Sequence, residues 1–324
     1  MNRFQAEKTP SLVTDPHFSP AERQNGNDSA QLAPSCAPKA PAPNLRGDYS
    51  HTHDDYTVDQ NWEKYSAAEH ALWRELYQRQ SAILPGMAAD DFIANLARMN
   101  AQDGIPKFDK ISEQLFAATG WRLVAVPGLV PDDAFFNHLA NRRFPVTVWL
   151  RKPEEIDYLV EPDVFHDFFG HVPMLFDPVF ADYLAAYGAK GPEAIKHGSL
   201  KQLARLYWYM VEFGLIKTTD GLRAYGAGML SSKSETLYCL SDPRPNRIGF
   251  ALERVMRTDY KIDDFQKTYF VLESYQQLFE ATLQDFENLY TRLASLPVIP
   301  PAGVLDSDRV YHFGNEGYAF DGTG

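Results

Sequence analysis

Cysteine is scarce in this 324-residue sequence, which contains only Cys36 and Cys239. Two cysteines cannot form a disulfide framework, so a small disulfide-stabilised secreted domain is excluded and a reducing compartment is favoured. No apolar run reaches the roughly 18 residues that a membrane-spanning helix needs. The N-terminus has neither a signal-peptide core nor the Arg-rich composition of a transit peptide. We therefore expect a cytoplasmic protein with no membrane partner.

Positive charge is also in short supply. A total of 31 Lys and Arg against 43 Asp and Glu gives a net charge of −12. Nucleic acids and anionic membranes bind basic faces, so this balance argues against both as partners. Aromatic residues, by contrast, are plentiful, with 21 Phe, 17 Tyr and 5 Trp. The sequence can therefore bury a large aromatic core.

Residues 1–48 carry seven prolines and no apolar period. Such a segment cannot offset its ordering entropy by burial, so we predict a disordered tail followed by a single domain over 49–324. Within that domain, short strands are predicted at 121–126 and 144–150. Apolar periodicity and end signals predict helices over 59–77, 90–99, 109–118, 131–139, 177–187, 199–215 and within 264–293. The expected fold class is mainly α with small β elements (α+β).

The most informative stretch is Glu161–Leu175, in which His166 and His171 stand among bulky apolar residues. These neighbours indicate burial, and a buried imidazole needs a partner. Asp163 is placed to cap a helix of about two turns that ends at Gly170. On a regular helix the two histidines point about 140° apart, so we expect them to converge only if the helix breaks before His171. Two separately satisfied core histidines remain the alternative.

A carboxylate partner for the two histidines is not singled out by spacing. Glu212 falls at the edge of the apolar arc of the predicted helix 199–215, for which Ser199 is the expected cap. An exposed glutamate that offsets nearby bases is one interpretation of Glu212. The other acidic residues that spacing leaves available as ligands are Asp167, Asp177 and Asp182.

If both histidines and one carboxylate share a metal, the set is that of the facial Fe(II) oxygenase sites, which leave open coordination positions. Zinc also accepts two histidines and a glutamate. However, the zinc peptidase motif is H-E-x-x-H, whereas the pattern here is H-D-x-x-G-H, so spacing and general base both differ. Iron is therefore favoured, and a zinc hydrolase is the alternative.

Three blocks of the sequence resemble the pterin-dependent aromatic amino acid hydroxylases. Glu161–Pro173 resembles the iron-binding segment of that family, Tyr207–Leu215 the segment with the third ligand, and Ala224–Ser232 a third block in the same order. The similarity covers about residues 50–295, which corresponds to the family's catalytic domain. It implies that family's fold, a tetrahydropterin cofactor and an oxidation in which O₂, iron and pterin generate a ferryl oxidant. The Fe(II) ligands that it implies are His166, His171 and Glu212.

The resemblance also implies where the pterin lies. The ring would lie near Val130 and Asp132 and stack on Phe135, with Asp167 and Tyr207 nearby. Tyr207, beside both iron and pterin, is grouped with the three metal ligands as a catalytic residue. Pro145 stands where the animal enzymes carry a pterin-contacting histidine, so this contact is expected to differ.

For the amino acid substrate, the resemblance implies that Arg151 pairs with the carboxylate, which suits its planar fork, and that Asp163 orients it. Ser231 would also hold His166. Leu159 stands where the animal enzymes carry a threonine near the substrate. The remaining residues that would line the pocket are Pro162, Trp208, Phe213, Gly228, Ser231 and Glu235.

The pattern around the substrate favours L-phenylalanine. Trp208 matches the phenylalanine and tyrosine hydroxylases better than the tryptophan enzymes, and Ile262 is apolar where tyrosine hydroxylases tend to carry an aspartate. A pocket with no partner for a hydroxyl should prefer phenylalanine. We therefore expect 4-hydroxylation of L-phenylalanine to L-tyrosine, with tyrosine or tryptophan hydroxylation as the alternative. Without the regulatory domain and tetramerisation helix of the animal enzymes, the chain resembles the short, monomeric bacterial members.

Overall fold

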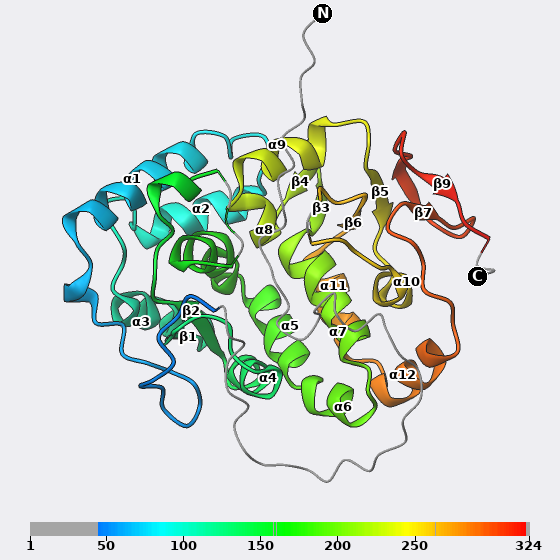
Figure 1. Ribbon diagram of the computed structural model, residues 1–324. Helices are drawn as coiled ribbons and strands as arrows, with labels where there is room; N and C mark the ends of the chain where they lie inside the picture. Colours follow the sequence, from blue (N-terminus) through cyan, green and yellow to red (C-terminus); the bar gives the residue numbers. More distant parts are fainter. Residues whose placement is uncertain (1–44, 158, 160, 263, 322–324) are drawn as a thin grey trace, which may run out of the picture.

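A computed structural model describes residues 45–157, 159, 161–262 and 264–321 of the chain. The predicted tail lies almost wholly outside these residues, so the tail and its boundary with the domain stay predictions. The described part is mainly helical with three small sheets, in agreement with the predicted fold class (Figure 1). None of its helices is both long and apolar enough to cross a membrane.

Three helices form the N-terminal part of the domain, at the left in Figure 1: α1 (Ala67–Ser81), α2 (Asp90–Met99) and α3 (Phe108–Thr119). Periodicity predicted α2 and α3 to within one residue. The predicted start of α1 at Asp59 is wrong. Ser66 accepts a hydrogen bond from the backbone N–H of Glu69, and the Glu69 carboxylate accepts one from the backbone N–H of Ser66. This capping box begins the helix at Ala67, eight residues later than predicted.

A two-stranded parallel sheet joins β1 (Arg122–Val126) and β2 (Arg143–Thr147) through the crossover helix α4 (Asp132–Ala140). The register pairs Val126 with Thr147, so both strands end at the same edge. Segments that leave the carboxyl ends of parallel strands lie side by side. This edge therefore brings the loop after β1 close to the segment that leads to Arg151.

A five-stranded mixed sheet has the order β4–β3–β6–β5–β8. Its strands are β3 (Leu215–Thr218), β4 (Gly221–Ala224), β5 (Asn246–Gly249), β6 (Thr268–Leu272) and β8 (Val310–His312). A third, small parallel sheet pairs β7 (Gly303–Val304) with β9 (Tyr318–Ala319).

The long helix predicted within 264–293 is wrong, because this region forms β6, α11 (Tyr275–Thr282) and α12 (Phe286–Ala294). The β6 sequence, T-Y-F-V-L, is β-branched and aromatic, and every residue in it is buried between two neighbouring strands. Ser274 and Asp285 then cap the two helices with their side chains. Apolar spacing alone did not separate a buried strand from a helix.

The remaining helices pack around a continuous aromatic core that includes Trp73, Trp121 and Tyr183, all completely buried. They are α5 (Pro178–Gly188), α6 (Gly191–Lys196), α7 (Leu200–Tyr207), α8 (Ala227–Leu230), α9 (Lys233–Ser241) and α10 (Leu252–Arg257). Short 3₁₀ turns occupy Trp62–Lys64, Pro153–Glu155 and Val172–Phe176.

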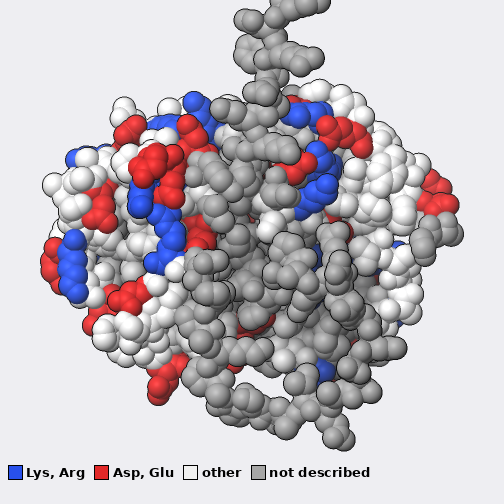
Figure 2. Space-filling view, viewed as in Figure 1, with Lys and Arg blue, Asp and Glu red and all other residues white. Residues whose placement is uncertain are grey.

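Charges of both signs are interleaved on the part of the surface that can be seen in one view. On the face shown in Figure 2, the visible Lys and Arg side chains lie beside Asp and Glu and do not merge into one basic area.

Candidate active site

The two histidines converge because their segment is a π-helix. The segment His166–His171 (η4) is π-helical over its whole length, so the expected break at Gly170 is wrong. Hydrogen bonds from i to i+5 make residues five apart neighbours on one face. Gly170 has a different reason to be glycine, since a Cβ there would lie 2.8 Å from the carbonyl oxygen of Ala227 in α8. The predicted cap is confirmed, because Asp163 Oδ1 accepts a hydrogen bond from the backbone N–H of His166 at 3.0 Å.

Glu212 enters the site from a second π-helix. The helix predicted over 199–215 is α7 followed by the π-helix Trp208–Glu212 (η6), and Ser199 makes no side-chain capping bond. The wider π turn changes the direction of the side chains after Tyr207. As a result Glu212 is 1% exposed, and its interpretation as an exposed glutamate is wrong.

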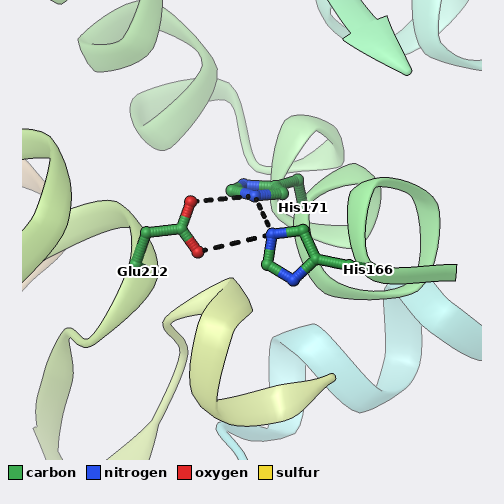
Figure 3. A group of neighbouring side chains, drawn as sticks. All are labelled: His166, His171 and Glu212. Carbon is green, nitrogen blue, oxygen red and sulfur yellow. Dashed lines mark hydrogen bonds and ion pairs between the residues drawn. The ribbon is translucent and has the colours of Figure 1, made fainter. Parts of the chain in front are cut away.

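The three side chains meet in one buried group (Figure 3). His171 Nε2 lies 3.1 Å from Glu212 Oε1, and His166 Nε2 lies 3.6 Å from Glu212 Oε2. The two Nε2 atoms are 3.2 Å apart. Three side chains from two separate segments therefore present their ligand atoms to one point.

The protonation of His166 follows from its neighbour Ser231. Ser231 Oγ donates to the Ala227 carbonyl at 2.8 Å, and it lies 2.9 Å from His166 Nδ1. Having used its proton, the hydroxyl accepts from Nδ1–H, which leaves the lone pair of His166 on Nε2, toward Glu212 and His171. The implied contact between Ser231 and His166 is thus present.

This donor set fits a divalent cation. Burial lowers the pKa of His166 to about 4, so its imidazole is neutral at pH 7, as a metal ligand must be. Burial acts to raise the pKa of Glu212, but His171 and His166 outweigh it and hold that pKa below its ordinary value. Glu212 Oε2 is buried without a hydrogen-bond partner. A buried carboxylate oxygen without a partner, facing the lone pair of His166 Nε2, is costly unless a cation lies between them.

The other carboxylates that spacing left available are engaged elsewhere. Asp167 Oδ2 accepts from the backbone N–H of Thr147 at 2.8 Å, and Asp177 caps α5. Asp182 pairs with Arg142 at the surface. Tertiary structure therefore selects Glu212 from the candidates.

A cavity opens beside the metal group. Its lining includes Val130, Asp132, Phe135, Asp167 and Tyr207, the five residues that the resemblance assigned to the pterin. The Phe135 ring contacts Tyr207 edge to face at 5.5 Å. Burial raises the pKa of Asp167 to about 7, although His171 opposes this shift.

The residues expected for the substrate divide between this cavity and a neighbouring hollow. Pro162 and Trp208 line the cavity, whereas Arg151 and Ser231 line the hollow. His166 links the two sets of lining residues, because it lines the first space and contacts Ser231, which lines the second.

Arg151 is 4% exposed, and its Nε and Nη2 donate to both oxygens of Asp163 at 2.9 Å. Burial alone would raise the pKa of Asp163, but Arg151 lowers it below its ordinary value. Nη1 is not used by this ion pair, so the guanidinium retains a donor for a carboxylate.

The remaining expected substrate residues pack against Glu212 or deeper in the core. A Cβ on Gly228 would be 3.1 Å from both Glu212 Oε2 and the Phe213 ring. Glu235 accepts from the Tyr269 hydroxyl at 2.6 Å, and Trp208 donates its indole N–H to Gln266 at 2.9 Å. Gly228, Phe213 and Glu235 are not part of the cavity lining.

Sequence reasoning missed several lining aromatics. Phe144 lies beside the His171 ring at 5.0 Å, and Tyr260 stacks on Trp208 with ring centroids 4.2 Å apart. Tyr187 also lines the cavity. In the sequence these rings have the pattern of buried core residues, so they could not be distinguished from aromatic residues that only pack in the core.

Comparison with known proteins gives one consistent result. The family model described as biopterin-dependent aromatic amino acid hydroxylase matches residues 48–297. The phenylalanine-4-hydroxylase of Ralstonia nicotianae is 57% identical over 267 residues, covering 82% of this chain and 85% of that protein. The enzyme of the same name from Chromobacterium violaceum is 57% identical over 272 residues, covering 83% of this chain and 92% of its own length.

The fold agrees with solved structures. The crystal structure of the Chromobacterium violaceum phenylalanine hydroxylase with iron and phenylalanine bound matches with a TM-score of 0.77 at 57% identity. The match covers 81% of this chain and 96% of that one. The cobalt-bound structure of the same protein matches with a TM-score of 0.79 at 58% identity.

Proposed function

This chain belongs to the biopterin-dependent aromatic amino acid hydroxylases, and on that premise we propose which of its side chains hold each component of the reaction. The activity is that of a phenylalanine 4-monooxygenase, which converts L-phenylalanine to L-tyrosine with O₂. The observation that carries this conclusion is the buried His₂Glu group in a chain 57% identical to phenylalanine-4-hydroxylases over most of its length.

Fe(II) and a tetrahydropterin supply the activation of O₂ when bound, and the protein supplies their placement. His166, His171 and Glu212 are the iron ligands. Among the described residues, this group would hold the ion with three side chains, which would leave coordination positions for small molecules. Ser231 holds the imidazole of His166 in the tautomer that presents Nε2.

For the pterin, we assign Val130, Asp132, Phe135, Asp167 and Tyr207. A flat ring matches the exposed face of Phe135, and the N–H groups of a pterin match carboxylate acceptors such as Asp132 and Asp167. Tyr207 stands between Phe135 and His171, with ring centroids 5.5 and 6.1 Å away, so it can orient ring and metal relative to each other. Pro145 offers no donor, and its contact with the ring is therefore apolar.

For the substrate, we assign Arg151 to the carboxylate and Pro162 and Trp208 to the aromatic side chain, with Phe213 supporting Trp208 from behind at a ring-centroid distance of 4.9 Å. Asp163 holds the guanidinium rigidly, so little side-chain entropy is lost when the amino acid binds. Gly228, Ser231 and Glu235 form the wall behind it. The aromatic lining excludes water from the reacting ring.

Phenylalanine is the substrate we propose over tyrosine and tryptophan, because Ile262 offers no partner for a phenol. We also propose a cytoplasmic monomer. A zinc hydrolase is disfavoured, because Asp167 follows His166 where the H-E-x-x-H motif has its general-base glutamate, and the second histidine comes five residues after the first, on a π-helix.

The experiment that tests this function loads the protein anaerobically with Fe(II), adds L-phenylalanine and a tetrahydropterin, and admits air. Tyrosine should form only when iron, pterin and O₂ are all present. No tyrosine from folded, iron-loaded protein would refute the assignment, and the other aromatic amino acids would then be tested, followed by zinc.

A further inference from the structure

The cavity wall formed by Gly128, Leu129 and Val130 is held from outside by a short N-terminal segment. The segment Arg46–Tyr49, here called the strap, precedes the first helix by about twenty residues and crosses the loop that follows β1. The Tyr49 hydroxyl donates to the carbonyl oxygen of Leu129 at 2.9 Å. Leu129 lines the cavity, so this hydrogen bond connects the strap directly to the wall.

The strap and the loop are in close contact at two glycines. A Cβ on Gly47 would lie 2.0 Å from the carbonyl oxygen of Pro127, and a Cβ on Gly128 would lie 2.8 Å from the Tyr49 hydroxyl. Neither position has room for a side chain, since Cβ contacts this short are essentially never found. The contact at Gly47 is with the main chain of Pro127 and requires glycine, whereas a side chain at Gly128 would displace the Tyr49 hydroxyl.

The other end of the strap is attached to the segment 149–161. The Arg46 guanidinium lies over the Trp149 ring at 4.6 Å and pairs with Glu155 at 2.9 Å. The backbone N–H of Arg46 donates to Glu161 at 3.3 Å, next to the cavity residue Pro162. The strap thus joins the loop after β1 to the segment that precedes the iron-binding π-helix.

We propose that the strap holds the loop Pro127–Val130 in the conformation that binds the pterin, with Tyr49 as the positioning residue. This inference rests on the proposed pterin site. Tyr49 does not line the cavity, and it acts through the main chain of Leu129. A loop that is already in its bound conformation binds more tightly, because the binding-competent fraction of the protein is larger.

The test uses the full chain loaded with iron and measures binding of 7,8-dihydrobiopterin, an unreactive pterin, by calorimetry. In Tyr49→Phe the Kd for this pterin should rise roughly three- to tenfold, the effect of losing one hydrogen bond. The KM for the tetrahydropterin should rise by the same factor, while kcat and the KM for phenylalanine stay within about twofold. Gly47→Ala should weaken binding further, because it forces the strap away from Pro127.

The matched control is Tyr65→Phe, which removes another tyrosine hydroxyl from a main-chain carbonyl, that of Val148, at 2.6 Å. Its pterin affinity should stay within about twofold of wild type. Equal pterin affinity in Tyr49→Phe and wild type would overturn the inference, as would a matching rise in the KM for phenylalanine. If Gly47→Ala does not fold, the comparison of Tyr49→Phe with Tyr65→Phe still tests the inference. Wild-type protein that binds no pterin would instead refute the proposed function.

Discussion

Two groups of side chains in this protein offer similar ligand atoms in similar proximity, yet their surroundings differ. His166, His171 and Glu212 form one group. Glu193 and His197, at α6, and Glu287, in the first turn of α12, form the other. In both, the potential ligand atoms lie within 4.8 Å of one another.

The first group is buried, whereas in the second the His197 and Glu287 side chains are 23% and 59% exposed. Water already solvates an exposed carboxylate, so a cation there displaces favourable hydration and gains little. Glu212 has lost its water and its Oε2 has no hydrogen-bond partner, so a cation removes a large cost. Proximity of ligands alone therefore does not make a metal site.

The largest effect expected from this difference is that of Glu212→Ala. The variant should lose bound iron and at least about a thousandfold in activity, because a ligand and its charge are gone, while the fold is retained. Metal analysis, tyrosine formation and circular dichroism measure the three properties. Normal hydroxylation by this variant would show that the ligand assignment is wrong.

Burial should also make two ion pairs differ in their contribution to the free energy of unfolding. Asp163→Ala leaves the Arg151 guanidinium buried without its partner and should lower the free energy of unfolding by about 3–5 kcal/mol. Asp182→Ala, which removes the exposed partner of Arg142, should cost less than about 1 kcal/mol. Urea unfolding of the metal-free proteins measures both values. Similar losses in the two variants would contradict the argument from burial.

A buried acid outside the metal group should give stability a pH dependence. Burial raises the pKa of Glu235 from its ordinary 4.5 to about 7, although the Tyr269 hydroxyl opposes the shift. Between these pH values the unfolded chain releases this proton and the folded chain keeps it. The contribution of Glu235 to the free energy of unfolding is therefore fully present below pH 4.5. It falls by up to about 3 kcal/mol as the pH rises to 7.

Glu235→Gln should remove that part of the pH dependence, so the variant gains stability relative to wild type as the pH rises from 5 to 8. Urea unfolding at several pH values measures the difference between the two proteins. Parallel curves for variant and wild type would show that Glu235 does not titrate in this range.

The smallest effect should come from a substitution in the exposed group of Glu193, His197 and Glu287. His197→Asn should leave the iron content at one ion per chain and change the free energy of unfolding by no more than about 0.5 kcal/mol. Titration with Fe(II) and with Zn(II), followed by metal analysis, counts the ions bound. Loss of a second bound ion in this variant would overturn the comparison between the two groups.

Local signals in the sequence predicted much of the fold. The apolar period and flanking residues located α2 and α3, and Asp163 was identified as a cap. The errors share one cause. Apolar spacing indicates that a segment is buried, but it does not show whether the segment is a helix or a strand. Thr268–Leu272 has the hydrophobicity of a core helix but is a strand between two other strands.

The sequence by itself determined the chemistry of the site, because two histidines among apolar residues, a glutamate and the family's motifs name the ligand types. Only the tertiary structure decided how the ligands meet. Residues 166–171 and 208–212 form π-helices, which turn His171 and Glu212 inward. Contacts with distant residues accompany these turns: Gly170 lies against Ala227, and Gly226 lies against the main chain of Glu212. Such contacts join segments far apart in the chain, so no local pattern could have shown them.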